Sequence, residues 1–198
     1  MNNFSRDYGP SDYLVKDRFT ATANYELPFG KNLKGAAGVV GKGWQFNGVY
    51  AFATGQPFTV LSGANTQGSF GVTSDRPSVQ PGSGFRQSIN EWIDVTQFVK
   101  QPFGTVGNEG HNDFTMPHNM RLDLSVFKDF RIRESMTLQF RAEGFNVANT
   151  PSFGMPNTTA TFNSSGVGTQ VGSTFGKITT TNAFYTPRDI QFALKLIF

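Results

Sequence analysis

The last twelve residues of the chain, 187–198, alternate strictly between polar and apolar side chains. Asp189, Gln191 and Lys195 fall on one side of an extended strand, because successive side chains of a strand point to opposite faces. The other side carries only apolar residues: Ile190, Phe192, Leu194, Leu196 and Phe198. A strand of this kind, ending on an aromatic residue, is typical of the closing strand of an outer-membrane β-barrel. The pattern therefore predicts an all-β protein of the barrel class.

Five segments in all show the period of two that indicates a strand. They cover residues of about 17–27, 43–60, 119–131, 136–147 and 187–198. A strand of twelve residues, tilted by about 40°, rises roughly 30 Å, which is enough to cross an apolar band of about 25 Å. We therefore expect residues 1–198 to form one partial barrel domain, an antiparallel meander of about five strands of a larger barrel.

The connections between these strands differ in length. Outer-membrane barrels have short turns on the periplasmic side and long loops on the extracellular side. If the terminal strand runs inward, the turn at 131–135 and the connection at 28–42 are periplasmic. The segments of about 62–118 and 148–186 are then predicted to be extracellular loops.

Composition supports an all-β fold and excludes other classes. The chain of 198 residues has 21 Phe and 22 Gly beside two His, which favours aromatic strands joined by glycine-rich loops. The mean hydropathy is −0.32, and no apolar run approaches the roughly 20 residues of a spanning helix. The net charge of +3 comes from scattered Lys and Arg, so no nucleic-acid partner is expected. The first ten residues are no secretory signal, so an exported barrel is expected to have a further upstream part.

Residues that carry chemistry elsewhere have simpler interpretations here. His111 and His118 match no compact zinc spacing, and without cysteine no thiolate site exists. Acid-base hydrolysis would need two carboxylates roughly 5 to 9 Å apart, a distance that the sequence does not show. The candidate loop acids are Glu91, Asp94 and Glu109, and we expect them to be ordinary loop residues. There is no Gly-X-Ser-X-Gly elbow and no dinucleotide loop. We therefore expect no catalytic residue, no metal, no cofactor and no enzyme activity.

The polar sides of the last strands are expected to face the barrel lumen. The candidate lumen-facing residues are Gln139, Arg141, Glu143, Asp189 and Lys195. Polar groups paired across strands are what a barrel wall needs, so we expect structural pairing here rather than direct contact with a ligand.

A series of motifs in order along the chain resembles one known family. The motifs are Tyr25–Gly30, Trp44–Tyr50, Thr54–Thr59, Asp75–Pro77, Phe103–Asn108, Leu122–Phe130, Leu138–Asn146, Asn149–Gly154 and the strand at Pro187–Phe198. Together they are similar to the C-terminal end of Oar-like TonB-dependent outer-membrane receptors, the type with a carboxypeptidase-regulatory-like N-terminal domain. The resemblance covers nearly the whole chain.

The resemblance implies a barrel of about 22 strands in a Gram-negative outer membrane, of which this chain supplies the last five. It implies import of a scarce ligand, with energy from the TonB complex acting through an N-terminal region that is missing here. The ligand class is not implied. The terminal strand resembles the signal for the barrel assembly machinery, with Phe198 as the terminal aromatic residue.

A soluble β-sandwich or lectin-like carbohydrate-binding module is the alternative that the pattern leaves open. A sandwich would bury Phe19, Phe46, Phe140 and Phe192 in a core between two sheets. A barrel would leave them on the outer face of one sheet. A non-transporting barrel such as an adhesin is a third hypothesis.

Overall fold

The computed structural model describes residues 4–29, 32–63, 66, 75–82, 84–183 and 186–198. The chain divides into two compact units. The sheet unit comprises Arg18–Ala53, Asn119–Pro151 and Phe184–Phe198. The loop unit comprises Met1–Asp17, Thr54–His118 and Ser152–Ala183.

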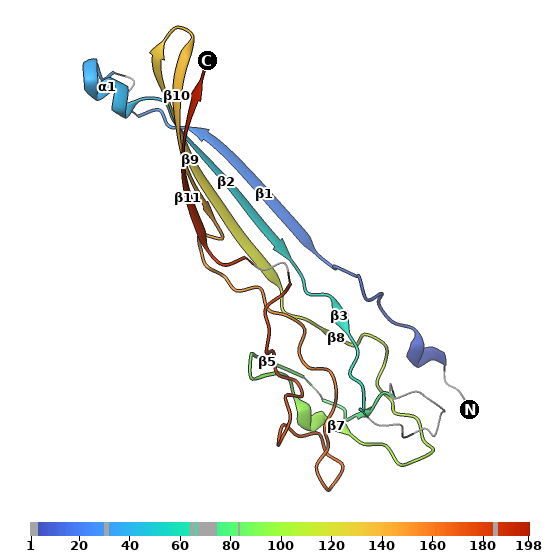
Figure 1. Ribbon diagram of the computed structural model, residues 1–198. Helices are drawn as coiled ribbons and strands as arrows, with labels where there is room; N and C mark the ends of the chain where they lie inside the picture. The colour runs from blue at the N-terminus through green and yellow to red at the C-terminus, as the bar shows by residue number, and fades with distance from the viewer. Residues whose placement is uncertain (1–3, 30–31, 64–65, 67–74, 83, 184–185) are drawn as a thin grey trace. The chain divides into compact units, whose positions relative to one another are not determined.

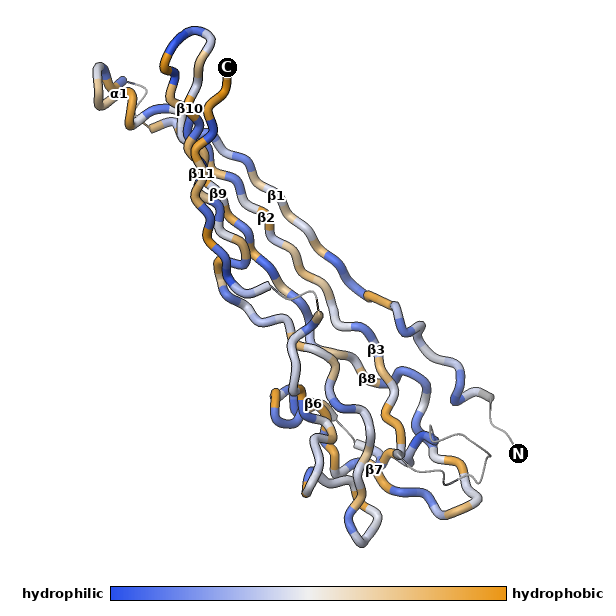
Figure 2. The backbone as a smooth tube through the Cα atoms, in the orientation of Figure 1, coloured by the Kyte–Doolittle hydropathy of each residue, from blue (hydrophilic) through white to orange (hydrophobic). Residues whose placement is uncertain are grey.

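The sheet unit is one antiparallel sheet of five strands in the order β1-β2-β9-β10-β11 (Figure 1). The strands are β1 Arg18–Glu26, β2 Trp44–Ala53, β9 Asn119–Arg133, β10 Met136–Phe145 and β11 Asp189–Ile197. Apolar and polar residues alternate along them, as Figure 2 shows. The predicted all-β antiparallel meander is confirmed.

Gly48 accommodates a large side chain on the central strand β9. Leu124 lies in register with Gly48 of β2 and with Gly144 of β10. A Cβ atom on Gly48 would lie 3.2 Å from Leu124 Cδ2. The pairing of β2 with β9 continues unbroken through Gly48, so this glycine serves a close side-chain approach and not a bulge.

The second strand ends at Ala53, earlier than the predicted boundary near residue 60. Beyond it, Gly55 packs against the backbone of another segment, and a Cβ there would lie 2.0 Å from the Met116 carbonyl oxygen. The chain then forms the short strand β3 Pro57–Phe58, which pairs with β8 Phe114–Thr115 in the loop unit.

The connection between β1 and β2 contains a short helix, α1 Gly35–Gly41, which the sequence pattern did not predict. Gly38 is its buried residue, and a Cβ there would lie 2.6 Å from the Leu33 carbonyl oxygen. Glycine is therefore needed for the chain to fold back on itself. Among the described residues, no helix has the length and hydropathy needed to cross a bilayer.

The loop unit is folded around a core of its own. Its further elements are the 3₁₀ turns η1 Phe4–Asp7 and η2 Val95–Gln97, and the strand pairs β4 Ser78–Val79 with β7 Phe98–Val99 and β5 Phe85–Ser88 with β6 Glu91–Ile93. Isolated bridges join its two long segments, for example Leu61 to Thr159. Among the described residues, its core cluster consists of Phe58, Val60, Ile93, Val95, Phe98, Phe114, Ala160 and Phe175.

Candidate functional site

One face of the sheet is apolar and is left uncovered by the described residues. Phe19 is 57% exposed and Phe192 is 73% exposed. Phe46 and Phe140 are only partly buried, by neighbours within the same sheet. A soluble sandwich would bury all four, and no second sheet covers them in the described part of the chain. An apolar face of this extent requires an apolar surrounding, which lipid provides.

The opposite face carries Gln139, Arg141 and Glu143 of β10, which were predicted to face the lumen. Gln139 Nε2 donates to Asp129 Oδ1 at 2.9 Å. Arg141 Nη2 donates to Glu143 Oε1 at 3.0 Å, and the Arg141 guanidinium lies 4.6 Å from the centre of the Phe127 ring. These side chains therefore form partners along the sheet surface, as a barrel wall needs.

The edge strand β11 carries the other two candidates on the same face. Lys195 is in register with Gln139, and Gln191 is in register with Glu143. Asp189, beside Phe145, accepts a hydrogen bond from Gln191 Nε2 at 2.9 Å. The five predicted polar residues thus share one face of β10 and β11.

A second polar network holds the far end of the β9–β10 pair, and the sequence pattern did not reveal it. Arg121 Nε donates to Asp123 Oδ1 at 2.8 Å and to Oδ2 at 2.9 Å. The Asn146 backbone amide donates to Asp123 Oδ1 at 2.8 Å. Asn146 Nδ2 also donates to the carbonyls of Thr150 and Thr186. The network ties the strand ends to the segment that leads into β11.

The apolar residues of the terminal strand share the face that carries Phe46 and Phe140. They pair across to β10, with Ile190 opposite Gly144, Phe192 opposite Ala142, Leu194 opposite Phe140 and Leu196 opposite Leu138. Phe198 follows the strand and is 88% exposed. The outer edge of β11 is unpaired in the described chain, so its backbone groups and apolar face are both accessible to a partner.

The motif at residues 75–77 forms a buried polar clamp in the loop unit. Asp75 Oδ2 accepts hydrogen bonds from the Thr66 backbone amide at 2.5 Å and from Thr66 Oγ1 at 3.1 Å. Arg76 forms an ion pair with Asp7 and donates to the Arg6 carbonyl at 2.9 Å. The motif therefore joins the first residues of the chain to the first long segment.

The motif at residues 103–108 packs against this clamp. A Cβ on Gly107 would lie 2.1 Å from the Arg76 carbonyl oxygen, so only glycine fits there. Arg6 Nη1 donates to the Gly107 carbonyl at 2.6 Å. Gln101 Nε2 donates to Thr66 Oγ1 at 2.6 Å and to the Arg76 carbonyl at 3.1 Å. Two motifs that are separate in sequence thus form one structural unit.

Glu109 is a buried carboxyl group beside the clamp, with an exposed fraction of 1%. Its Oε1 accepts a hydrogen bond from the Val60 amide at 2.7 Å, and Oε2 has no hydrogen-bond partner in the described structure. Burial raises the pKa of Glu109 to about 8, although the Val60 amide lowers it. Asp113 raises the pKa further, whereas Arg76 and Arg6 lower it.

The remaining chemical candidates have structural partners. Asp94 Oδ2 accepts from Arg86 Nη2 at 2.7 Å, and Glu91 lies 4.0 Å from the same guanidinium. His111 Nε2 lies 3.8 Å from Asp12 Oδ1. Within the described ranges, no group of three or more His, Cys, Asp or Glu residues is placed to hold a metal ion.

Lys128 and Phe127 depart from the alternation of β9, and the sequence reasoning passed over both. Phe127 lies on the polar face beneath Arg141. Lys128 lies on the apolar face, in register with Trp44 and Phe140, and is 1% exposed. Counting odd and even positions from Leu122 shows that each of the two residues lies on the face opposite to the one its polarity suggests.

A comparison with protein families agrees with this geometry. The profile of the family described as "Outer membrane beta barrel domain" matches residues 1–191. No curated protein and no solved structure gave a significant match. The match accounts for the uncovered apolar face and locates the protein in the outer membrane, with lipid as its surroundings. The chain belongs to the outer membrane beta barrel domain family.

Proposed function

We propose that the chain is the C-terminal part of the barrel of an Oar-like, TonB-dependent outer-membrane receptor, which imports a scarce ligand and is not an enzyme. The observation that carries the proposal is the folding of the two long connections, between β2 and β9 and between β10 and β11, into a unit with its own core. Simple barrel loops need no such core. A receptor that must recognise a ligand outside the cell needs a defined surface on its long loops.

The direction of the strands supports a larger barrel. Every neighbouring pair in the sheet is antiparallel, so the edge strands β1 and β11 run in the same direction. They are therefore unsuited to antiparallel pairing with each other. A closed antiparallel barrel that contains this sheet needs an odd number of further strands. A receptor barrel of about 22 strands meets that condition.

The proposed orientation follows the lengths of the connections. The β9–β10 turn and the β1–β2 connection face the periplasm, and the two long connections face the exterior. The TonB complex acts from the periplasmic side through the N-terminal region of the receptor. Gln139, Arg141, Glu143, Asp189 and Lys195 line the lumen and support the wall against which a plug or ligand moves.

The terminal strand is proposed as the signal for the barrel assembly machinery. Its free edge and its apolar row, Ile190, Phe192, Leu194, Leu196 and Phe198, offer backbone groups and side chains on one accessible strand. β-Strand addition to a free edge is a common recognition mode, in which backbone hydrogen bonds provide affinity and side chains provide specificity.

Binding to the TonB protein tests the receptor proposal. The native protein, extracted from outer membranes in detergent, would be mixed with the purified periplasmic domain of TonB from the same cells. A receptor should be retained by that domain, and an excess of free domain should release it. A protein that migrates as a folded barrel on unheated gels but is not retained would be a non-transporting barrel, such as an adhesin, and the receptor proposal would fail.

A further inference from the structure

The described part of the β1–β2 connection, residues 27–29 and 32–43, is attached to the apolar face of the sheet at two points. Trp44 Nε1 donates to the Val40 carbonyl of α1 at 2.9 Å. Lys128 Nζ donates to the Lys42 carbonyl. Trp44 and Lys128 are register partners on β2 and β9. The helix is therefore held beside the sheet surface and does not extend freely from the strand ends.

Lys128 carries the only charge in the run Met120–Phe130 on the apolar face of β9. Its Nζ lies 5.4 Å from the centre of the Trp44 ring and 4.8 Å from that of Phe130. Lysine and aromatic side chains gather in this way where a membrane protein passes from hydrocarbon to headgroups. Lys128 therefore marks the edge of the lipid-facing band.

The position along the strand agrees with that assignment. Leu124 lies midway between Met120 and Lys128 on the apolar face of β9. Four residues at about 3.3 Å each, on a strand tilted by about 40°, advance about 10 Å along the barrel axis. That is close to half of an apolar band about 25 Å tall. Trp44 is bonded to α1, and Lys128 is bonded to Lys42 directly after it, so this spacing supports headgroup depth for the helix.

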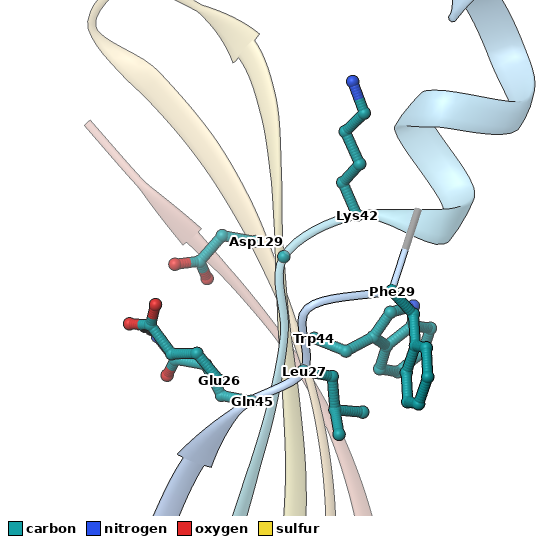
Figure 3. Close-up of a pocket in the computed structure, with 8 residues that line it drawn as sticks. Glu26, Leu27, Phe29, Lys42, Trp44, Gln45 and Asp129 are labelled. Atoms are coloured by element: carbon teal, nitrogen blue, oxygen red, sulfur yellow. Dashed lines mark hydrogen bonds between the residues drawn. The ribbon is translucent and has the colours of Figure 1, made fainter. Parts of the chain in front are cut away.

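The connection exposes apolar side chains at this depth. Phe29 is 70% exposed, Val39 60% and Val40 62%. Figure 3 shows Leu27, Phe29 and Trp44 on one side of a hollow at the strand ends, opposite the polar Glu26, Gln45 and Asp129. The apolar surface of the connection is therefore continuous with the lipid-facing side of the sheet.

The charges of the connection complement one kind of surface. Residues 27–43 contain three lysines, Lys31, Lys34 and Lys42, and no acidic residue. Lysines beside exposed apolar residues on a short amphipathic segment suit a layer of acyl chains covered by phosphate groups. A soluble protein partner would not explain why the apolar surface of the connection is continuous with the apolar face of β2.

We propose that the described part of the β1–β2 connection is an interfacial anchor, with Val39 and Val40 of α1 set against the acyl chains of a phospholipid leaflet and Lys34 and Lys42 near the phosphates. The proposal rests on the proposed function for the side of the membrane, since the periplasmic side is the one to which the short connections are assigned. The anchor restrains the barrel wall at the depth marked by Lys128.

Site-specific fluorescence tests the anchor. The chain has no cysteine, so one cysteine can be placed in the native protein, with any cysteine outside this chain changed to serine. Val40→Cys would be labelled with an environment-sensitive fluorophore and reconstituted into vesicles of phosphatidylethanolamine and phosphatidylglycerol that contain brominated acyl chains. Phe192→Cys on the lipid-facing side and Asn24→Cys on the polar side are the matched controls.

If the anchor is in the leaflet, bromolipids should quench the probe at position 40 at least half as strongly as the probe at position 192. The quenching at position 40 should also be at least twice that at position 24. Quenching at 40 no greater than at 24, with strong quenching at 192, would refute the anchor alone. Weak quenching at 192 would refute the membrane placement of the sheet, and the anchor with it. Both leaflets of these vesicles are phospholipid, so the result does not depend on the assigned side.

Discussion

Phe98 and Phe175 are fully buried in the loop unit, whereas Phe19 and Phe192 of the sheet unit are more than half exposed. Phe103 of the loop unit is also exposed, but the loop unit has a core of buried phenylalanines and the described sheet unit has an uncovered row of them. Burial of an aromatic side chain stabilises a fold in water. A continuous exposed apolar face of a sheet instead indicates an apolar surrounding. The contrast indicates that the loop unit is built to fold in water and the sheet unit to face lipid.

The largest expected effect is in the loop-unit core. Phe98 packs against Phe114 and Phe175, with ring centres 5.5 Å and 5.4 Å apart. Phe98→Ala should lower the free energy of unfolding of the loop unit by about 3–5 kcal/mol, because it removes buried area and leaves a cavity. Hydrogen exchange in the native protein would show faster exchange in loop-unit peptides and unchanged exchange in sheet peptides.

Phe192→Ala is the matched control for that change. Its side chain lies on the uncovered face, so the substitution should leave loop-unit exchange unchanged and have a small effect on the sheet. Equal effects of the two substitutions on loop-unit peptides would contradict the division into two independently stabilised units.

The difference between the units also explains what the sequence could reveal. Strands β1, β2, β9, β10 and β11 are long and alternate over most of their length, so their existence and order were predictable. The loop-unit core was not, because Phe58, Phe98 and Phe175 come from distant segments, and the first two lie in strands of two residues. Such short strands leave no periodic signal. The same holds for α1, which consists only of glycine, alanine and valine and has no amphipathic pattern.

The second expected effect concerns the two faces of the sheet. Leu124→Arg places a charge on the apolar face near the middle of the lipid band, which should cost about 2–4 kcal/mol. Ser125→Arg, one residue along, places the same charge on the polar face in register with Glu143 and should be tolerated. The fraction of folded barrel on unheated gels, taken over a urea series, would measure both. Equal tolerance would show that lipid does not cover the face of Leu124.

The third effect is a dependence of the stability of the loop unit on pH. The pKa of Glu109 is about 8 in the folded state and 4.5 without burial, so folding takes up a proton between these values. The contribution of Glu109 to the free energy of unfolding should therefore be highest below pH 4.5 and should fall as the pH rises towards 8. Between pH 6 and 8 the loss is about 2 kcal/mol.

Glu109→Gln should remove this dependence, since the amide stays neutral and can still accept from the Val60 amide. Glu91→Gln, in the same unit but beside the exposed Arg86, should leave the slope of the native protein unchanged. Hydrogen exchange of loop-unit peptides from pH 6 to 8, corrected for intrinsic rates, would show the slope. A slope in Glu109→Gln equal to that of the native protein would assign the dependence to another group.

Sequence motifs predicted part of the candidate site but not its long-range contacts. The Asp-Arg-Pro motif at residues 75–77 was identifiable as a sequence element. Its partners Asp7 and Thr66 were not, because they are set by how the first residues of the chain fold against the long connection. On β9, alternation predicted the polar face but gave no reason for a lysine on the apolar one. The role of Lys128 becomes clear only with Trp44 and Phe130 around it.

The smallest expected effect tests whether the terminal residues act through the face they occupy. Phe198 follows the apolar row of β11, and Ile197 lies on the polar face, opposite Thr137. If the apolar row is the assembly signal, Phe198→Ser should lower outer-membrane abundance a few-fold, or about 1 kcal/mol in an equilibrium between inserted and rejected protein. Ile197→Ser should have less effect, although it also replaces an apolar side chain. Quantitative blotting of outer-membrane fractions measures the abundance of both variants. Equal losses would mean that assembly depends on hydrophobic residues at the chain end, whichever face of the strand they occupy.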